Sequence, residues 1–162
     1  MARIELWNGD ICDLEVDAIV NAANLSLWMS TGVGGAIKRA GGDAIEFAAV
    51  RQAPVALGGA IVTPAGNLAA RAVIHAVSLD RDRRTSGSII DAAVRSAMAR
   101  AREMNATSNA FPALGTGGPA GRRSTRPSAA RWPAPARSTP RASRFRRSER
   151  VSAATPSTKP RS

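Results

Sequence analysis

Nearly all branched aliphatic residues of this 162-residue chain lie before Gly118, and Val151 is the only valine, leucine or isoleucine that follows. Burial of apolar surface is the main force that offsets the loss of chain entropy on folding, so a core can form only from the first part. We therefore expect one domain over residues 1–118. Residues 119–162 have too little to bury and are expected to be disordered.

The formal net charge of +11 belongs to the C-terminal segment. Residues 1–118 carry equal numbers of basic and acidic side chains, whereas residues 119–162 carry twelve basic side chains and a single acid, Glu149. Such a segment binds nucleic acid without sequence preference by neutralising phosphates, and this is the alternative function. Its two aromatic residues, Trp132 and Phe145, show no stacking pattern.

Cysteine and histidine are too scarce for a disulfide or a metal centre. Cys12 and His75 are the only residues of their kinds, so no metal and no cofactor is expected. We interpret Cys12 as a small buried residue and not a nucleophile, and His75 as a structural histidine and not a general base. Charges interrupt the first residues, and no stretch approaches the roughly 18 apolar residues of a membrane span. We expect a cytoplasmic monomer that does not contact a membrane.

Strand-like and helix-like patterns alternate in the first part of the chain. The expected strands are residues 3–7, 17–21, 60–63, 72–77 and 109–114, and the expected helices are residues 32–40, 44–51 and 88–104. For the second helix, Asp43 and Glu46 have the spacing of a capping box. For the third, Ser88 and Asp91 are expected to supply the cap. This alternation predicts an α/β fold with a mixed, mostly parallel sheet covered on both faces.

Three loops rich in glycine or asparagine each follow an expected strand, where open α/β sheets bind ligands. In the first, Asp10 can accept a hydrogen bond from an amino group such as that of adenine, although Asn-Gly-Asp is also common turn chemistry. In the second, glycines before a helix can hold an anion with backbone N–H groups. The candidates there are Asn21, Asn24, Gly32, Val33, Gly34 and Gly35; in the third loop they are Gly115, Thr116 and Gly117.

Each of these loops also has a simpler interpretation. A single glycine-rich loop is typical of flexible linkers, Asn24 either binds a ribose hydroxyl or caps a turn, and Trp28 covers either the ligand or the core. Two glycine loops and an acid at three strand ends, however, favour a binding site for a diphosphate.

The order and spacing of the motifs in residues 3–118 resemble those of the macro domain family. The motifs are Gly9-Asp10-Ile11, Asp17-Ala18-Ile19-Val20-Asn21-Ala22-Ala23-Asn24, Gly32-Val33-Gly34-Gly35-Ala36-Ile37, Val62-Thr63-Pro64-Ala65-Gly66-Asn67-Leu68, Val73-Ile74-His75-Ala76-Val77 and Phe111-Pro112-Ala113-Leu114-Gly115-Thr116-Gly117. The resemblance implies a three-layer α-β-α fold that is incomplete at its C-terminal end.

The resemblance also implies a ligand, ADP-ribose, either free or attached to a protein. Asp10 is then expected to hold the adenine amino group, Ile11 to contact the ring or a nearby backbone atom, and Asn24 to bind the distal ribose. Residues 32–35 and 115–117 are expected to wrap the diphosphate. Hydrolysis of an ADP-ribosyl linkage, of O-acetyl-ADP-ribose or of ADP-ribose 1''-phosphate is a further expectation, with Asn24 as the catalytic residue.

Two features depart from the family pattern. One hydrolytic branch has an aspartate where this chain has Gly34; without that acid, activation of water by a phosphate of the ligand is the route left open for catalysis, and binding is the better supported function. After Gly118 the strand and helices that normally continue the fold are not recognisable. We hypothesise a shift of reading frame near residues 117–119, which translation of the other two frames tests, and a non-functional product is one outcome of that hypothesis.

Overall fold

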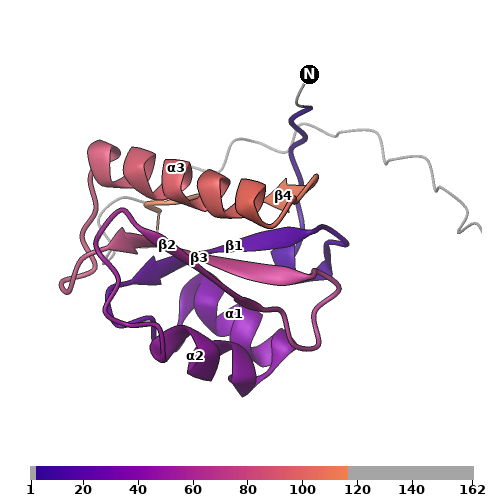
Figure 1. The fold of residues 1–162 in the computed structure, drawn as a ribbon, viewed down its shortest axis with the longest axis horizontal. Helices are drawn as coiled ribbons and strands as arrows, with labels where there is room; N and C mark the ends of the chain where they lie inside the picture. Colours follow the sequence, from indigo (N-terminus) through magenta and orange to yellow (C-terminus); the bar gives the residue numbers. More distant parts are fainter. Residues whose placement is uncertain (1–2, 117–162) are drawn as a thin grey trace, which may run out of the picture. The chain divides into compact units, whose positions relative to one another are not determined.

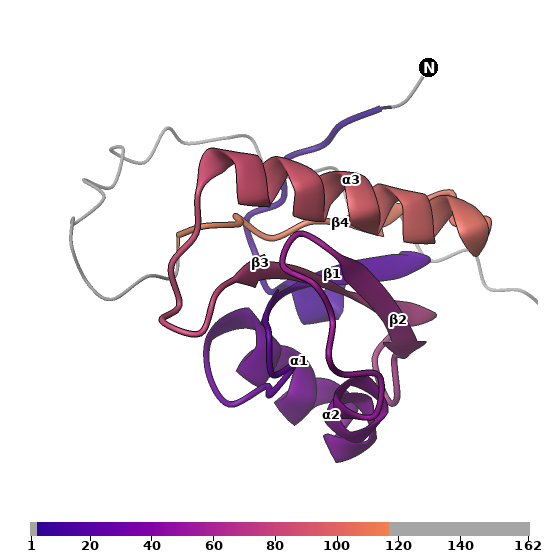
Figure 2. The ribbon, with the colours of Figure 1, turned by 60° about the vertical axis from the view of Figure 1, so that its left-hand side comes forward.

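The computed structural model describes residues 3–116. Its elements are η1 (Ile11–Asp13), β1 (Ala18–Asn24), α1 (Gly32–Gly41), α2 (Asp43–Val50), β2 (Ala60–Pro64), β3 (Ala72–Leu79), α3 (Gly87–Glu103) and β4 (Asn109–Ala110). The sheet lies between α3 on one face and α1 with α2 on the other (Figure 1), and the turned view shows the same three layers (Figure 2). The expected α-β-α arrangement is confirmed. Gly117 and the expected disordered segment 119–162 lie outside the described residues.

The sheet is mixed and mostly parallel, as the sequence predicts. Its four strands run in the order β2-β3-β1-β4, with β1 parallel to β3 and to β4, and β2 antiparallel to β3. All eight residues of β3 are buried, which is typical of a strand covered by helices on both faces. The register places Asn21 of β1 beside His75 of β3.

The alternation of side chains along β1 divides the core between the two faces of the sheet. Ala18 and Val20 face α3 and pack with its buried alanines Ala93, Ala97 and Ala101. These small side chains repeat on one face of the helix and let it approach the sheet closely. Ile19 lies on the opposite face and packs with Ile37 of α1 and Ile45 of α2. Asn21 shares the face of Ile19, so its side chain points toward α1.

The expected strand at residues 3–7 is wrong. No strand forms there, and Ile4 and Leu6 are 89% and 100% exposed. A strand exists only where a neighbour completes its hydrogen bonds, and within residues 3–116 nothing pairs with this segment. The last expected strand, 109–114, shortens to Asn109–Ala110 for the same reason, because only these two residues pair with β1.

Both expected helix caps are also wrong, although the helices themselves form. Ser86 caps α3 by accepting a hydrogen bond from the amide of Ile89, because α3 starts at Gly87 and the expected cap residue Ser88 is already helical. Gly42 precedes α2, and Asp43 caps nothing. Glu46 turns away from the helix end to hydrogen-bond partners in the core.

Among the described residues, no helix is long and apolar enough to span a membrane. Within the same residues, no group of histidine, cysteine, aspartate or glutamate side chains gathers into a metal-binding cluster.

Candidate functional site

The N-terminus of α1 lies next to the end of β1 and presents backbone N–H groups there. The first hydrogen bond of the helix joins the amide of Gly35 to the carbonyl oxygen of Thr31 at 3.1 Å. By the geometry of a helix, the amides of Gly32, Val33 and Gly34 have no acceptor within it. Gly32 has a φ of +62°, which a glycine adopts at little cost. The combined amides and helix dipole favour an anion at this position.

Asn21 lies directly beneath this helix end and is 2% exposed. Its Nδ2 donates a hydrogen bond to Nδ1 of His75 at 3.1 Å. Its Oδ1 has no partner among the described residues, and a Cβ added to Gly34 would lie 3.1 Å from that oxygen. The site therefore contains a buried acceptor oxygen whose hydrogen bond is not made, and the missing side chain of Gly34 leaves the space beside it open.

His75 orients the side chain of Asn21 through a hydrogen bond. Burial lowers the pKa of His75 to about 4, so the ring is neutral near pH 7. Because Nδ1 accepts from Asn21, the ring proton is on Nε2, which lies 2.9 Å from Oγ1 of Thr63. Both ring nitrogens are thus engaged, and the structure agrees with a structural histidine.

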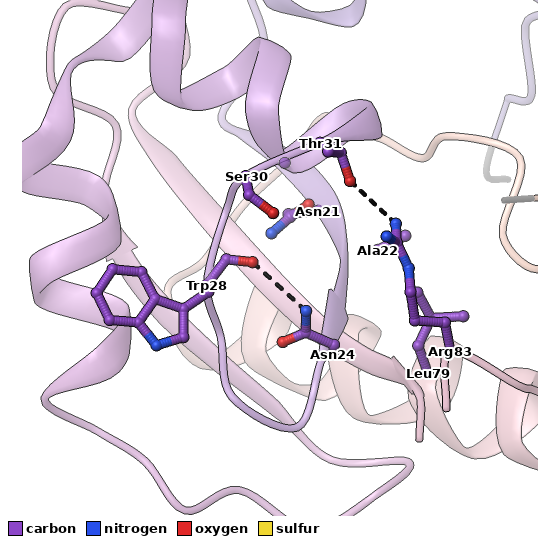
Figure 3. Close-up of a pocket in the computed structure, with 9 residues that line it drawn as sticks. Asn21, Ala22, Asn24, Trp28, Ser30, Thr31, Leu79 and Arg83 are labelled. Atoms are coloured by element: carbon purple, nitrogen blue, oxygen red, sulfur yellow. Dashed lines mark hydrogen bonds between the residues drawn. The ribbon is translucent and has the colours of Figure 1, made fainter. Parts of the chain in front are cut away.

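A cavity of about 70 Å³ adjoins the helix end and brings several predicted residues together (Figure 3). It is lined by Asn21, Ala22, Asn24, Trp28, Ser30, Thr31, Gly34, Leu79 and Arg83. A second cavity of about 170 Å³ is lined by Asn24, Leu25, Ser26, Asp80, Arg81 and Arg83. Asn24 and Arg83 line both cavities, so the two hollows adjoin at these side chains.

Asn24 shapes the loop that forms one wall of the cavity. Its Oδ1 accepts hydrogen bonds from the amide and the hydroxyl of Ser26, at 3.1 and 2.8 Å. Its Nδ2 lies 3.5 Å from the carbonyl oxygen of Trp28 (Figure 3). Trp28 is 56% exposed, and its indole extends away from Asn24 (Figure 3), so Trp28 does not cover the core.

Asp10 and Ile11 lie apart from this cavity, at the 3-10 turn η1. Asp10 caps the turn by accepting a hydrogen bond from the amide of Cys12 at 2.9 Å, and this bond lowers the pKa of the Asp10 carboxyl. Ile11 packs against the core cluster that includes Ile37. Burial raises the pKa of the partly buried Cys12 thiol to about 11, which opposes a role as nucleophile.

Gly115 and Thr116, the described residues of the third predicted loop, do not line the cavity either. Gly115 has a φ of +80° and packs beside Ile90 of α3. The hydroxyl of Thr116 donates to the carbonyl oxygen of Ala113 at 2.9 Å. Gly117 lies outside the described residues.

Ser30 and Leu79 line the cavity although they were not predicted, and so does a charged residue, Arg83. Its Nη2 donates a hydrogen bond to Oγ1 of Thr31 at 3.0 Å (Figure 3), which brings a guanidinium beside the N-terminus of α1. The available signal was the run Asp80-Arg81-Asp82-Arg83-Arg84 directly after the buried strand β3. Charged residues at that position lie at the edge of the sheet where β1 also ends.

Comparisons with known proteins agree with this fold and site. The family model described as Macro domain matches residues 20–121. An O-acetyl-ADP-ribose deacetylase of Salmonella gallinarum is 42% identical over 122 residues, which cover 72% of this chain and 68% of that protein. An uncharacterized protein of Mycobacterium tuberculosis is 43% identical over 117 residues. The alignment covers 72% of this chain but 33% of that relative, so the chain spans about a third of its length.

Solved structures give the same result. A mutant of the Oceanobacillus iheyensis macrodomain, solved with ADPR, is 28% identical with a TM-score of 0.61, covering 67% of this chain and 63% of that one. A Trypanosoma brucei macrodomain in complex with ADP-ribose is 30% identical with a TM-score of 0.62, covering 68% and 47%. The matched family, the sequence identity and the shared fold all lead to one assignment. This chain belongs to the macro domain family.

Proposed function

We propose that this protein binds ADP-ribose or a derivative of it at the N-terminus of α1. The observation that carries the proposal is the position of the free amides of Gly32, Val33 and Gly34 beside the unpaired Oδ1 of buried Asn21. Amides bind anionic oxygens, whereas a carboxamide oxygen binds a hydroxyl donor. A ligand with a phosphate next to a sugar satisfies both. Relatives whose names mention ADP-ribose support this choice.

The residues are assigned to parts of the ligand as follows. The diphosphate lies against residues 32–34, where each charge-assisted amide contact contributes roughly 1.5–3 kcal/mol. The distal ribose lies against Asn24. Asp10 and Ile11 are proposed for the adenine end, and residues 115–117 for the other side of the diphosphate.

The size of the cavity limits how much of the ligand it encloses. Sites for a whole small-molecule ligand usually have about 300–1,000 Å³, and the cavity beside Asn21 has about 70 Å³. It therefore takes one sugar or phosphate group, and the rest of the ligand extends along the surface. An exposed ligand end is compatible with ADP-ribose attached to a protein, which is the proposed partner.

Hydrolysis of O-acetyl-ADP-ribose is a second candidate function, favoured by the 42% identity to a deacetylase. Asn24 is the proposed catalytic residue because it lines the cavity. Of the described side chains that line this cavity, none is an acid or a histidine, and His75 is occupied on both nitrogens. A phosphate oxygen of the ligand is therefore the proposed base. Proton NMR of O-acetyl-ADP-ribose incubated with the protein tests this step, because it detects the acetate that hydrolysis releases.

Titration calorimetry of ADP-ribose into the full chain tests binding. Three amide contacts of the size above sum to about 4.5–9 kcal/mol, which gives an expected dissociation constant between about 0.2 and about 500 μM. Adenosine, which has no phosphate, is expected to bind much more weakly. No heat with ADP-ribose up to about 1 mM rules the proposal out. The basic charge that suggests nucleic-acid binding lies outside the described residues, so that function stays an alternative; the cytoplasmic location and the monomeric state stay predictions.

A further inference from the structure

The loop between β3 and α3 is a tight turn held together by its own hydrogen bonds. Oδ1 of Asp80 accepts from the amides of Asp82 and Arg84, at 2.9 and 2.7 Å. The amide of Asp80 donates to the carbonyl oxygen of Arg84. The amide of Arg83 donates to the carbonyl oxygen of Asp80. Four hydrogen bonds within five residues give this loop a defined shape at the edge of the sheet.

This turn holds Arg83 in a conformation that an arginine rarely adopts. Its φ is +60°, in the left-handed region, where the Cβ of an L-residue lies too close to the backbone. The conformation directs the guanidinium across to Thr31, whose Oγ1 it reaches at 3.0 Å. Thr31 precedes α1 but its hydroxyl makes no cap to the helix, so this oxygen is available to hold Arg83.

The resulting arrangement is electrostatically unfavourable without a ligand. A cation is repelled by the positive end of the helix dipole. Within residues 3–116, no carboxylate lies within salt-bridge distance of Arg83, although seven other pairs form. An anion between the guanidinium and the free amides of α1 converts this repulsion into two attractions.

An independent observation indicates that a ligand belongs here. The 2% exposed Asn21 has its unpartnered Oδ1 beside the same helix end. Arg83 also lies where the cavities of about 70 and about 170 Å³ meet. Because Arg83 lines both cavities, a group that occupies either of them lies beside this residue.

We propose that Arg83 is a specificity-determining residue whose guanidinium binds a phosphate oxygen of the ligand, opposite the amides of Gly32, Val33 and Gly34. This inference rests on the proposed function and adds to it a side-chain contact that selects for charge. Arginine suits the task because its planar fork donates two parallel hydrogen bonds to one phosphate. The contact places the diphosphate between α1 and the 80–84 turn.

Calorimetry on the full chain compares Arg83→Asn with Arg84→Asn. Both substitutions remove one positive charge from the same turn, and asparagine tolerates the left-handed conformation. Arg84 is the matched control because its side chain faces Asp82 and lines neither cavity. At about 50 mM salt, where surface charges are least screened, Arg83→Asn is expected to weaken ADP-ribose binding about tenfold or more. Arg84→Asn is expected to change it less than about twofold.

A second measurement separates a direct contact from a loss of folding. Arg83→Lys keeps the charge and should recover part of the affinity, and circular dichroism verifies that each variant is folded. Raising the salt to about 300 mM should weaken ADP-ribose binding by the unaltered protein more than it weakens binding by Arg83→Asn. Equal affinities of Arg83→Asn and the unaltered protein for ADP-ribose overturn the inference but leave the proposed function standing. Equal losses of affinity in Arg83→Asn and Arg84→Asn have the same meaning. Absence of binding by the unaltered protein overturns both.

Discussion

Oε2 of Glu46 accepts a hydrogen bond from the backbone amide of Met29 at 2.6 Å. Glu46 belongs to α2, whereas Met29 belongs to the loop that follows Asn24 of β1 and ends at Thr31, before α1. The other oxygen of Glu46 accepts from Nζ of Lys38 in α1, also at 2.6 Å. A carboxylate that is 2% exposed thus connects α2, α1 and the loop that forms the cavity wall.

Glu46→Ala is expected to lower the free energy of unfolding by about 3 kcal/mol, because it leaves the Met29 amide and the Lys38 ammonium without their buried partner. Urea denaturation measures the change. Glu103→Gln is the control, since Glu103 and Arg100 form an exposed pair and such pairs contribute little. Similar urea midpoints for the two variants would show that the buried contacts are not stabilising.

His75 makes stability depend on pH below neutrality. Its pKa is about 4 in the folded protein and 6.5 in an unperturbed chain, so the unfolded state takes up a proton first as the pH falls. The free energy of unfolding is therefore highest, as far as His75 is concerned, above pH 6.5. It declines by about 1.4 kcal/mol per pH unit between pH 6.5 and pH 4. Urea denaturation should show a loss of about 2 kcal/mol from about pH 7.5 to about pH 5.

His75→Gln isolates this contribution, because the chain has no other histidine. The variant is expected to lose most of the pH dependence in that interval while other groups titrate as before. An unchanged slope in His75→Gln would assign the effect to another group.

Gly34→Ala is expected to weaken ADP-ribose binding about tenfold, because its Cβ would lie 3.1 Å from Oδ1 of Asn21 and fill the space beside that oxygen. Gly87→Ala is the matched control, because Gly87 also begins a helix and a Cβ there meets nothing within 4 Å. Calorimetry gives the affinities. Full affinity in Gly34→Ala would place the ligand elsewhere.

Cys12 is expected to react slowly with thiol reagents. Burial raises its pKa to about 11, so at about pH 8 the thiolate fraction is about 100-fold below that of an ordinary cysteine. Alkylation by iodoacetamide, followed by mass spectrometry, measures the rate against free cysteine. A rate like that of free cysteine would show that the pKa of the Cys12 thiol is not raised.

The secondary structure was predictable where it depends on local periodicity. The expected helix at 88–104 differs from α3 by one residue at each end, because its apolar face repeats every turn. The strand expected at 3–7 has an equally clear alternation and does not form. Alternation shows that a segment suits a strand, but pairing requires a neighbour that no local pattern specifies.

The candidate site divides in the same way. Asn21, Asn24 and Gly34 were predicted, because polar residues after a buried strand are readily recognised, and the structure brings them to one cavity. Asp10 and Thr116 were predicted with them but lie outside it. Arg83 was missed because its contact with Thr31 spans 52 positions and depends on a left-handed turn.

The sequence by itself determined where the apolar residues are concentrated, that residues 3–116 have an α/β fold, and that polar loops follow its strands. These properties follow from which residues are apolar and how they are spaced. Only the tertiary structure decided that Asn21 meets His75 across 54 positions and leaves its Oδ1 unpaired. It also decided that the guanidinium of Arg83 hydrogen-bonds Thr31, the residue that precedes α1. Such contacts depend on strand register and loop shape, which the whole folded chain sets.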